Sequence, residues 1–101
     1  MAEPARSREE IHQRLTPLRP ELTRLGVRSL ALFGSAARDT LRPDSDLDIL
    51  VELDGAARFD PFMDLKLLLE ETLGRPVDLV TTGAMKPALR ARIEPDLLRV
   101  A

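Results

Sequence analysis

Apolar and polar residues alternate along positions 46–53, which is the clearest pattern in the chain. Successive side chains of a strand point to opposite faces, so this alternation predicts a strand with one face in the core. The core-facing side carries four apolar residues, Leu47, Ile49, Val51 and Leu53. The opposite side carries three carboxylates and one leucine, Asp46, Asp48, Leu50 and Glu52.

Two further runs predict strands in the same sheet. Residues 27–33 form an apolar run that ends at Gly34, as expected for a buried strand followed by a turn. Residues 76–81 place Val77 and Leu79 on one face and Asp78 on the other.

Helical spacing of apolar residues predicts helices in the remaining segments. Ser7 with Glu10 three positions later is a capping-box pattern, so a helix is expected from there, interrupted at Pro17 and Pro20 and ending at Gly26. A short helix is expected over residues 35–40. A last helix is expected to begin at Lys86-Pro87, to end before Pro95, and to be followed by an apolar tail.

The longest predicted helix has Asp60 as its N-cap and Pro61 as its first helical residue, and it ends at Leu73. Its core stripe is spaced at three and four residues and comprises Phe62, Leu65, Leu69 and Leu73. Met63 and Leu67 fall outside this stripe. They are expected either to form an exposed patch for a partner or to pack under the loop at 54–60.

This order of elements predicts an α/β (α+β) fold, with a small mixed sheet of three to four strands and helices on one face. The chain has 101 residues, so we expect a single domain over 1–101, with a flexible terminus at 1–6. The face without helices is expected to carry Asp46, Asp48 and Asp78.

The composition and net charge of the chain argue against several classes of function. The net charge is −2 and the pI is about 5.4, which argues against a general nucleic-acid binder. There is no cysteine, so disulfides and thiolate zinc sites are excluded, and the only histidine, His12, is expected to be solvated. No apolar run is long enough for a membrane span, which predicts a cytoplasmic protein without a membrane partner.

The carboxylates form the first half of a candidate site. Residues i and i+2 of a strand point to the same face, roughly 6.5–7 Å apart, so Asp46 and Asp48 can converge on metal ions. Hard oxygen ligands suit Mg²⁺, which also takes ligands from substrate phosphates. Asp78 has the right parity to join them from the neighbouring strand.

The second half is the turn after the first strand. Gly34 lets the backbone approach a ligand closely, and Ser35 offers a hydroxyl and an N–H at a helix start, where an anion is favoured. Arg38, three residues later, falls on the same side and can reach a phosphate oxygen. The alternative for this turn alone is an ordinary helix cap with a surface arginine.

The two halves together resemble the signature of the minimal nucleotidyltransferases of the DNA polymerase β-like superfamily. The resemblance rests on residues 33–38, Phe-Gly-Ser-Ala-Ala-Arg, and residues 45–49, Ser-Asp-Leu-Asp-Ile, and it extends over roughly residues 10–98. It implies a mixed sheet, Mg²⁺, with two ions expected, and ATP as the substrate.

The resemblance also implies roles for individual residues. Gly34, Ser35 and Arg38 would bind the triphosphate, Asp46, Asp48 and Asp78 would be catalytic and hold the metals, and Asp78 would help to activate the acceptor hydroxyl. It further implies an antitoxin that attaches AMP to a tyrosine of a HEPN-family toxin. The alternatives are an antitoxin that neutralises its toxin by binding alone, and nucleotidyl transfer to a small molecule or to RNA.

Two features of the chain bear on the acceptor and on the nucleotide. The chain contains no tyrosine, so a tyrosine acceptor has to come from another molecule. Its only aromatic residues are Phe33, Phe59 and Phe62, which are expected in the core and so do not mark a base pocket.

Overall fold

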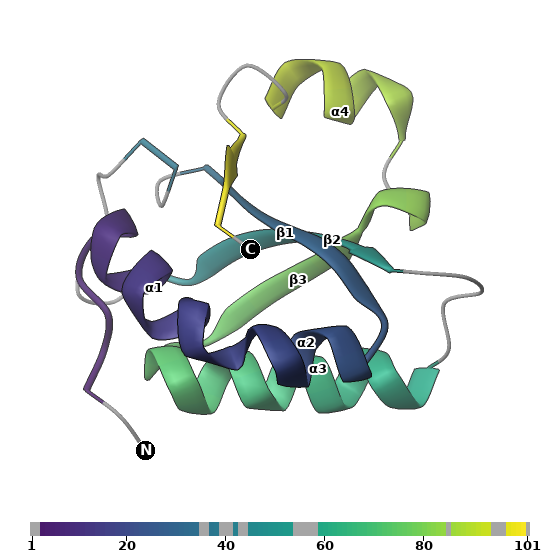
Figure 1. Ribbon diagram of the computed structural model, residues 1–101. Coiled ribbons are helices and arrows are strands. Elements are labelled where there is room, and N and C mark those ends of the chain that lie inside the picture. The colour runs from purple at the N-terminus through teal and green to yellow at the C-terminus, as the bar shows by residue number, and fades with distance from the viewer. Residues whose placement is uncertain are drawn as a thin grey trace.

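The structure is a computed structural model, and it describes residues 3–34, 37–38, 42, 45–53, 59–84, 86–93 and 97–100. Its elements follow one another as shown in Figure 1. They are α1 (Arg8–Leu15), η1 (Thr16–Leu18), α2 (Arg19–Arg24), β1 (Val27–Phe33), β2 (Leu47–Leu53), α3 (Phe59–Leu73), β3 (Val77–Thr81), η2 (Thr82–Ala84), α4 (Pro87–Ile93) and β4 (Leu98–Arg99).

The sheet has four strands in the order β3-β2-β1-β4. β1 pairs antiparallel with β2 and with β4, whereas β2 pairs parallel with β3. The predicted mixed sheet is therefore confirmed. The strand β4 was not predicted, because two residues in an apolar tail carry no strand pattern of their own. They become a strand by pairing Leu98 and Arg99 with the exposed edge of β1.

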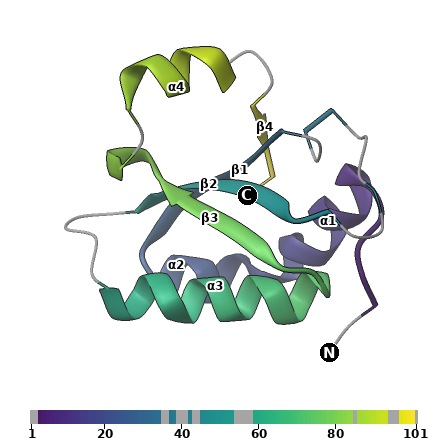
Figure 2. The ribbon, with the colours of Figure 1, turned by 180° about the vertical axis from the view of Figure 1, so that it is seen from behind.

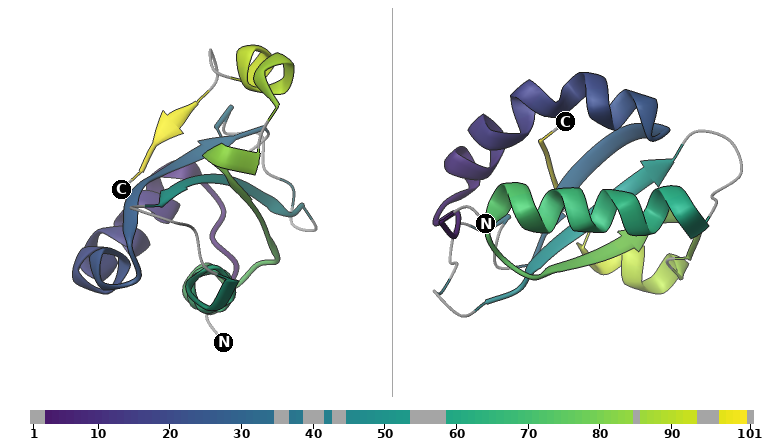
Figure 3. Two further views of the ribbon diagram at one scale, coloured as in Figure 1. Left: turned by 90° about the vertical axis from the view of Figure 1, so that its right-hand side faces the viewer. Right: turned by 90° about the horizontal axis from the view of Figure 1, so that it is seen from below.

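α1, α2 and α3 pack on one face of the sheet, as predicted (Figure 2). The fully buried core lies between these helices and the sheet, and its largest members are Ile11, Leu15, Leu30, Leu32, Leu47, Ile49, Val51, Leu65, Leu69 and Leu73. α4 departs from the expectation, because it lies on the opposite side of the sheet (Figure 3). No helix of the described segments combines the length and the apolar character that a membrane span requires.

Of the predicted N-cap residues Ser7 and Asp60, only Ser7 lies at the start of its helix. Ser7 is the N-cap of α1, and its hydroxyl accepts a hydrogen bond from the Glu10 N–H at 3.1 Å, as predicted. The predicted N-cap at Asp60 is wrong, because α3 already begins at Phe59 and includes Asp60 and Pro61. A proline is tolerated there, since the N–H groups of a first helical turn have no partner within the helix.

The N-terminal segment is anchored over residues 3–6, unlike the flexible terminus that was expected for 1–6. Ala5 is fully buried, and its N–H donates to the Leu73 carbonyl at 2.9 Å. The Ala5 carbonyl in turn accepts a hydrogen bond from Arg75. This segment therefore belongs to the packed structure around the end of α3.

Candidate active site

Asp48 and Asp78 come from the adjacent strands β2 and β3, and Asp46 directly precedes β2. Asp48 is in register with Asp78 across the parallel pair and with Phe33 across the antiparallel pair. Residues in register on adjacent strands point to the same face, about 4.8 Å apart. Asp46 precedes Asp48 by two residues and is exposed, as is Asp78. The structure thus places Asp48 and Asp78 next to each other on the side away from α1–α3.

Asp46, Asp48 and Asp78 form a row of carboxylates, and their negative charges affect the pKa of Asp48. Burial of the half-buried carboxyl raises the pKa of Asp48 above its usual value, and the negative charges of Asp78 and Asp46 raise it further. A cation bound beside these like charges would offset their repulsion. The row is therefore a place where a divalent cation would relieve repulsion.

Gly34 brings the predicted turn directly against this row. Its φ of +67° lies in the left-handed region, which glycine adopts without strain. A Cβ atom at position 34 would collide with the Asp48 carboxylate oxygen Oδ2. The two halves of the sequence motif are therefore in contact, and only a residue without a side chain allows that contact.

The rest of the predicted phosphate turn is described only in part. Ser35 lies outside the described residues. The Arg38 N–H donates to the Gly34 carbonyl at 3.3 Å, which is the hydrogen-bond spacing of one helical turn, and residues 35, 36, 39 and 40 of the expected short helix lie outside the described residues. The Arg38 side chain is exposed.

The chain matches the nucleotidyltransferase domain family over residues 15–99. The chain belongs to this family. It is 41% identical over 92 residues to the protein adenylyltransferase MntA of Thermococcus cleftensis, covering 90% of this chain and 89% of that protein.

Solved structures agree with this assignment. A candidate minimal nucleotidyltransferase superimposes with a TM-score of 0.80 at 33% identity, over 91% of this chain and 94% of that chain. A complex of a tri-AMPylated Shewanella oneidensis HEPN toxin with an MNT antitoxin matches with a TM-score of 0.67 at 18% identity, which shows the shared fold. That match covers 93% of this chain and 71% of the other.

The face of the nucleotidyltransferase that carries the aspartates is partly covered. Leu50 is on the same face as Asp48 but is only 5% exposed. A cavity of about 200 Å³ lies there, lined by Ser29, Ala31, Leu50, Glu52, Thr82, Leu97 and Arg99. This hollow is formed by the sheet, η2 and the segment around β4, and none of the three aspartates is among the residues that line it.

Arg75 supports this site, and sequence reasoning missed it. It is only 5% exposed, and its Nε donates to the Ala5 carbonyl at 2.6 Å. Its Nη1 donates to the carbonyls of Arg42 and Ser45, at 2.7 and 2.8 Å. Ser45 directly precedes Asp46, so Arg75 holds the start of the carboxylate segment. A single arginine between Gly74 and Pro76 carries no sequence signal for this role.

We expect Arg75→Met to lower the free energy of unfolding by about 2–4 kcal/mol, because buried carbonyls lose charged hydrogen-bond donors. Urea denaturation measures this change. Arg24→Met is the matched control, since Arg24 is exposed and pairs only with Glu21, at 3.2 Å. Equal destabilisation by the two substitutions would contradict the anchoring role of Arg75.

The aspartates fit a metal in their chemistry. Among the described residues, no three histidine, cysteine or carboxylate side chains form a ready-made metal cluster. Asp48 and Asp78 nevertheless supply hard oxygen donors on one face, Asp46 lies two residues before Asp48, and burial together with the charges of Asp78 and Asp46 raises the pKa of Asp48. Mg²⁺ is commonly bound by one or two carboxylates together with water and substrate phosphates, so it does not require a closed protein cage.

Proposed function

We propose that this nucleotidyltransferase transfers AMP from ATP to a tyrosine hydroxyl of a HEPN-family toxin and thereby acts as its antitoxin. The observation that carries the proposal is the contact between the Gly34 turn and the Asp48 carboxylate, with Asp78 in register beside it. The similarity to a named protein adenylyltransferase supports transfer to a protein. The shared fold with an MNT antitoxin in complex with an AMPylated HEPN toxin is consistent with this kind of partner.

The proposed roles of the residues are those that the resemblance to the minimal nucleotidyltransferases implies. Gly34, Ser35 and Arg38 bind the triphosphate, and Asp46, Asp48 and Asp78 hold Mg²⁺. Bound Mg²⁺ would neutralise phosphate charge and so lower the barrier to substitution at phosphorus.

In the reaction, the acceptor oxygen bonds to the α-phosphorus while the bond to the bridging oxygen breaks, and pyrophosphate leaves. The proton of the acceptor hydroxyl passes to Asp78. Because Asp78 is exposed at the edge strand β3, it is accessible to a hydroxyl group presented by another protein.

The acceptor has to come from a second molecule, because the chain contains no tyrosine. Met63 and Leu67 of α3 are 37% and 54% exposed, so the structure favours the exposed patch over packing under the 54–60 loop. Apolar side chains at this spacing lie one helical turn apart and offer a surface that a helical partner can cover. The same surface would serve an antitoxin that neutralises its toxin by binding alone.

The decisive experiment combines the purified chain, a HEPN protein encoded beside it, Mg²⁺ and ATP labelled on either the α- or the γ-phosphate. We expect label on the HEPN protein from α-labelled ATP only, with mass spectrometry locating AMP on a tyrosine. Label from γ-labelled ATP would indicate phosphoryl transfer instead. Toxin neutralisation without any label would support the binding-only alternative.

Ser35→Ala is expected to weaken ATP binding about tenfold without lowering the unfolding midpoint, because one hydroxyl donor to a charged phosphate is lost. Calorimetric titration with a non-hydrolysable ATP analogue measures the affinity, and circular dichroism monitors folding. Unchanged affinity would mean that Ser35 only caps the turn.

A further inference from the structure

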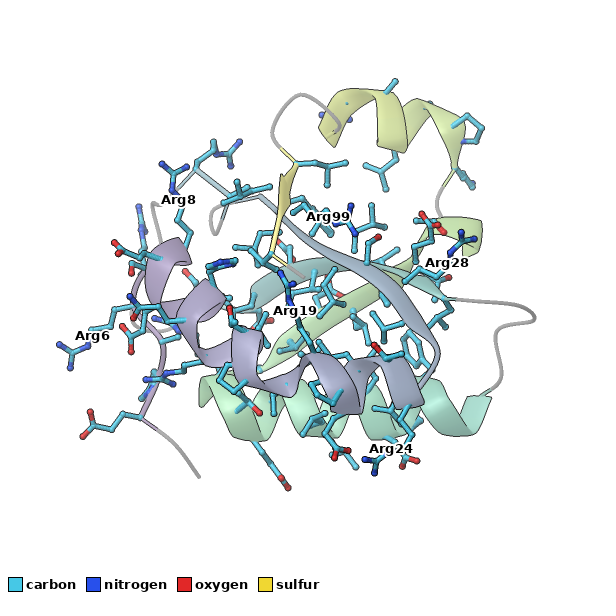
Figure 4. The ribbon with its side chains drawn as sticks, in the orientation of Figure 1. Arg6, Arg8, Arg19, Arg24, Arg28 and Arg99 are labelled. Atoms are coloured by element: carbon cyan, nitrogen blue, oxygen red, sulfur yellow. The ribbon has the colours of Figure 1, made fainter. Side chains whose placement is uncertain are left out.

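A second cavity lies away from the aspartates, between the helices α1 and α2 and the sheet edge formed by β1 and β4. Its volume is about 390 Å³, and it is lined by three arginines, Arg19, Arg28 and Arg99, and by His12. No carboxylate is among the described residues that line it. This is notable in a chain with 17 acidic and 15 basic residues, because most concave surfaces of such a protein would carry both signs. Figure 4 shows Arg19 and Arg99 on the same side of the molecule.

The basic side chains that line this cavity differ in whether they already have a bonding partner. The Arg28 guanidinium lies 3.7 Å from a Glu52 carboxylate oxygen, so its charge is already partly balanced. His12 Nδ1 lies 3.2 Å from the Val100 carbonyl, which fixes the ring at the cavity wall. The Arg19 guanidinium has no hydrogen-bond or ion-pair partner within the described segments. Arg19 therefore supplies the cavity's unpaired charge among the described residues, and Arg99 on β4 lines the same cavity.

The remaining wall of the cavity is apolar with one hydroxyl. Leu22 and Val100 are buried beneath it, Val27 is half-buried, and Thr23 adds a hydroxyl donor. A bare inorganic ion would use the arginines and leave the apolar wall uncovered. A ligand with a phosphate at one end and an apolar ring system at the other would use both, and about 300–1,000 Å³ is the usual size of such pockets.

A neighbouring hollow of about 300 Å³ shares His12, Arg99 and Val100 with this cavity. It is also lined by Glu9, whose negative charge would repel an anion there. Arg8 on the same wall offsets that charge in part. The phosphate end of a ligand is therefore favoured in the larger cavity, beside Arg19.

Arg99 also lines the 200 Å³ hollow on the aspartate face, but the rest of the cavity lies at the other end of β1 from the aspartates. Val27, in its wall, is the first residue of β1, whereas Phe33, in register with Asp48, is the last. Six residues of strand span about 20 Å. A ligand of ordinary size in the cavity therefore does not reach the aspartates.

We propose that this cavity is a second, metal-independent binding site for a small organic phosphate of about the size of a nucleoside monophosphate. Arg19 and Arg99 bind the phosphate, Thr23 donates a further hydrogen bond, and the organic part lies on Val27 and Val100.

Calorimetric titration with AMP and with inorganic phosphate, both in excess EDTA, tests the site. The expected result is AMP binding without Mg²⁺, at least about tenfold tighter than inorganic phosphate. Arg19→Gln should weaken AMP binding about tenfold or more, because a charge-assisted hydrogen bond to phosphate is lost. Arg24→Gln is the matched control on the same helix, since Arg24 pairs with Glu21 and is outside the cavity lining, and it should leave AMP affinity unchanged.

Four results would overturn the proposal. AMP that binds only with Mg²⁺, or that fails to bind to Asp46→Asn/Asp48→Asn, would place its binding at the aspartates. Equal affinity for AMP and inorganic phosphate would exclude a role for the apolar wall. If Arg19→Gln and Arg24→Gln weakened AMP binding equally, AMP would be attracted by the overall surface charge and not by the cavity. If a short single-stranded RNA bound more tightly than AMP, and Arg19→Gln weakened the RNA binding, the cavity would be a nucleic-acid site.

Discussion

Replacing Asp46 and Asp48 together by asparagine is expected to reduce Mg²⁺-dependent AMP transfer to the HEPN partner by about a thousandfold or more. Metal-ion stabilisation of a phosphoryl transition state is worth several kcal/mol, and each 1.36 kcal/mol is a factor of ten in rate. Asparagine keeps the size of the side chain but removes the charge that holds the cation. Initial rates of label transfer from α-labelled ATP measure the loss, and undiminished transfer would mean that these two residues are not the metal ligands.

The single variant Asp48→Asn shows whether that loss reflects chemistry or misfolding. Because the folded pKa of Asp48 is raised above its value in the unfolded chain, the folded state holds its proton more tightly. Asp48 therefore destabilises the fold increasingly as the pH rises from the ordinary aspartate pKa of about 3.8 through the raised pKa. Without metal, Asp48→Asn should raise the free energy of unfolding at neutral pH, and this gain should vanish below the unfolded pKa.

Urea denaturation in EDTA at several pH values measures this difference. The matched variant is Glu52→Gln, on the same face of β2, where the carboxylate lies near Arg28 rather than near other acids. It should not gain stability at neutral pH. A loss of stability in Asp48→Asn at neutral pH would contradict the repulsion that is inferred for the carboxylate row.

The sequence predicted those parts of the site that depend only on the alternation of side chains between the two faces of a strand. The alternation from Asp46 to Leu53 assigns each residue to a face, because a strand has a period of two whatever it packs against. The same rule placed Asp78 on the face of Asp48, and the register of β2 with β3 bears this out. Gly34 was expected to let the backbone approach a ligand; its proximity to the Asp48 carboxylate, which the structure shows, was not predicted.

The parts that were missed depend on contacts between distant segments. Arg75 bonds to backbone carbonyls about 30 and 70 residues away, and any buried donor can serve carbonyls, so no local pattern reveals it. β4 exists only through its pairing with β1. Arg19 and Arg99 reach one cavity from opposite ends of the chain, and a sequence rich in arginine does not single them out.

Gly34→Ala is expected to reduce AMP transfer by about a hundredfold or more while the protein still folds. Two costs act at this position. Alanine in the left-handed region costs about 1 kcal/mol of stability. Its Cβ would also collide with Oδ2 of Asp48, so the carboxylate has to turn away from the position in which we propose that it binds Mg²⁺. A displacement of about 1 Å in a catalytic group is worth about a hundredfold in rate.

Gly74→Ala separates these two costs. Gly74 has a φ of +66°, against +67° for Gly34, so alanine meets the same backbone strain at the end of α3. Thermal unfolding should show similar stability losses for both variants, but label transfer measured at a temperature where both are folded should fall only in Gly34→Ala. Equal transfer rates would mean that Asp48 adjusts to the added methyl group, and that Gly34 serves only the backbone turn. A selective loss would show that the glycine of this motif is required because it leaves space for the metal-binding carboxylate.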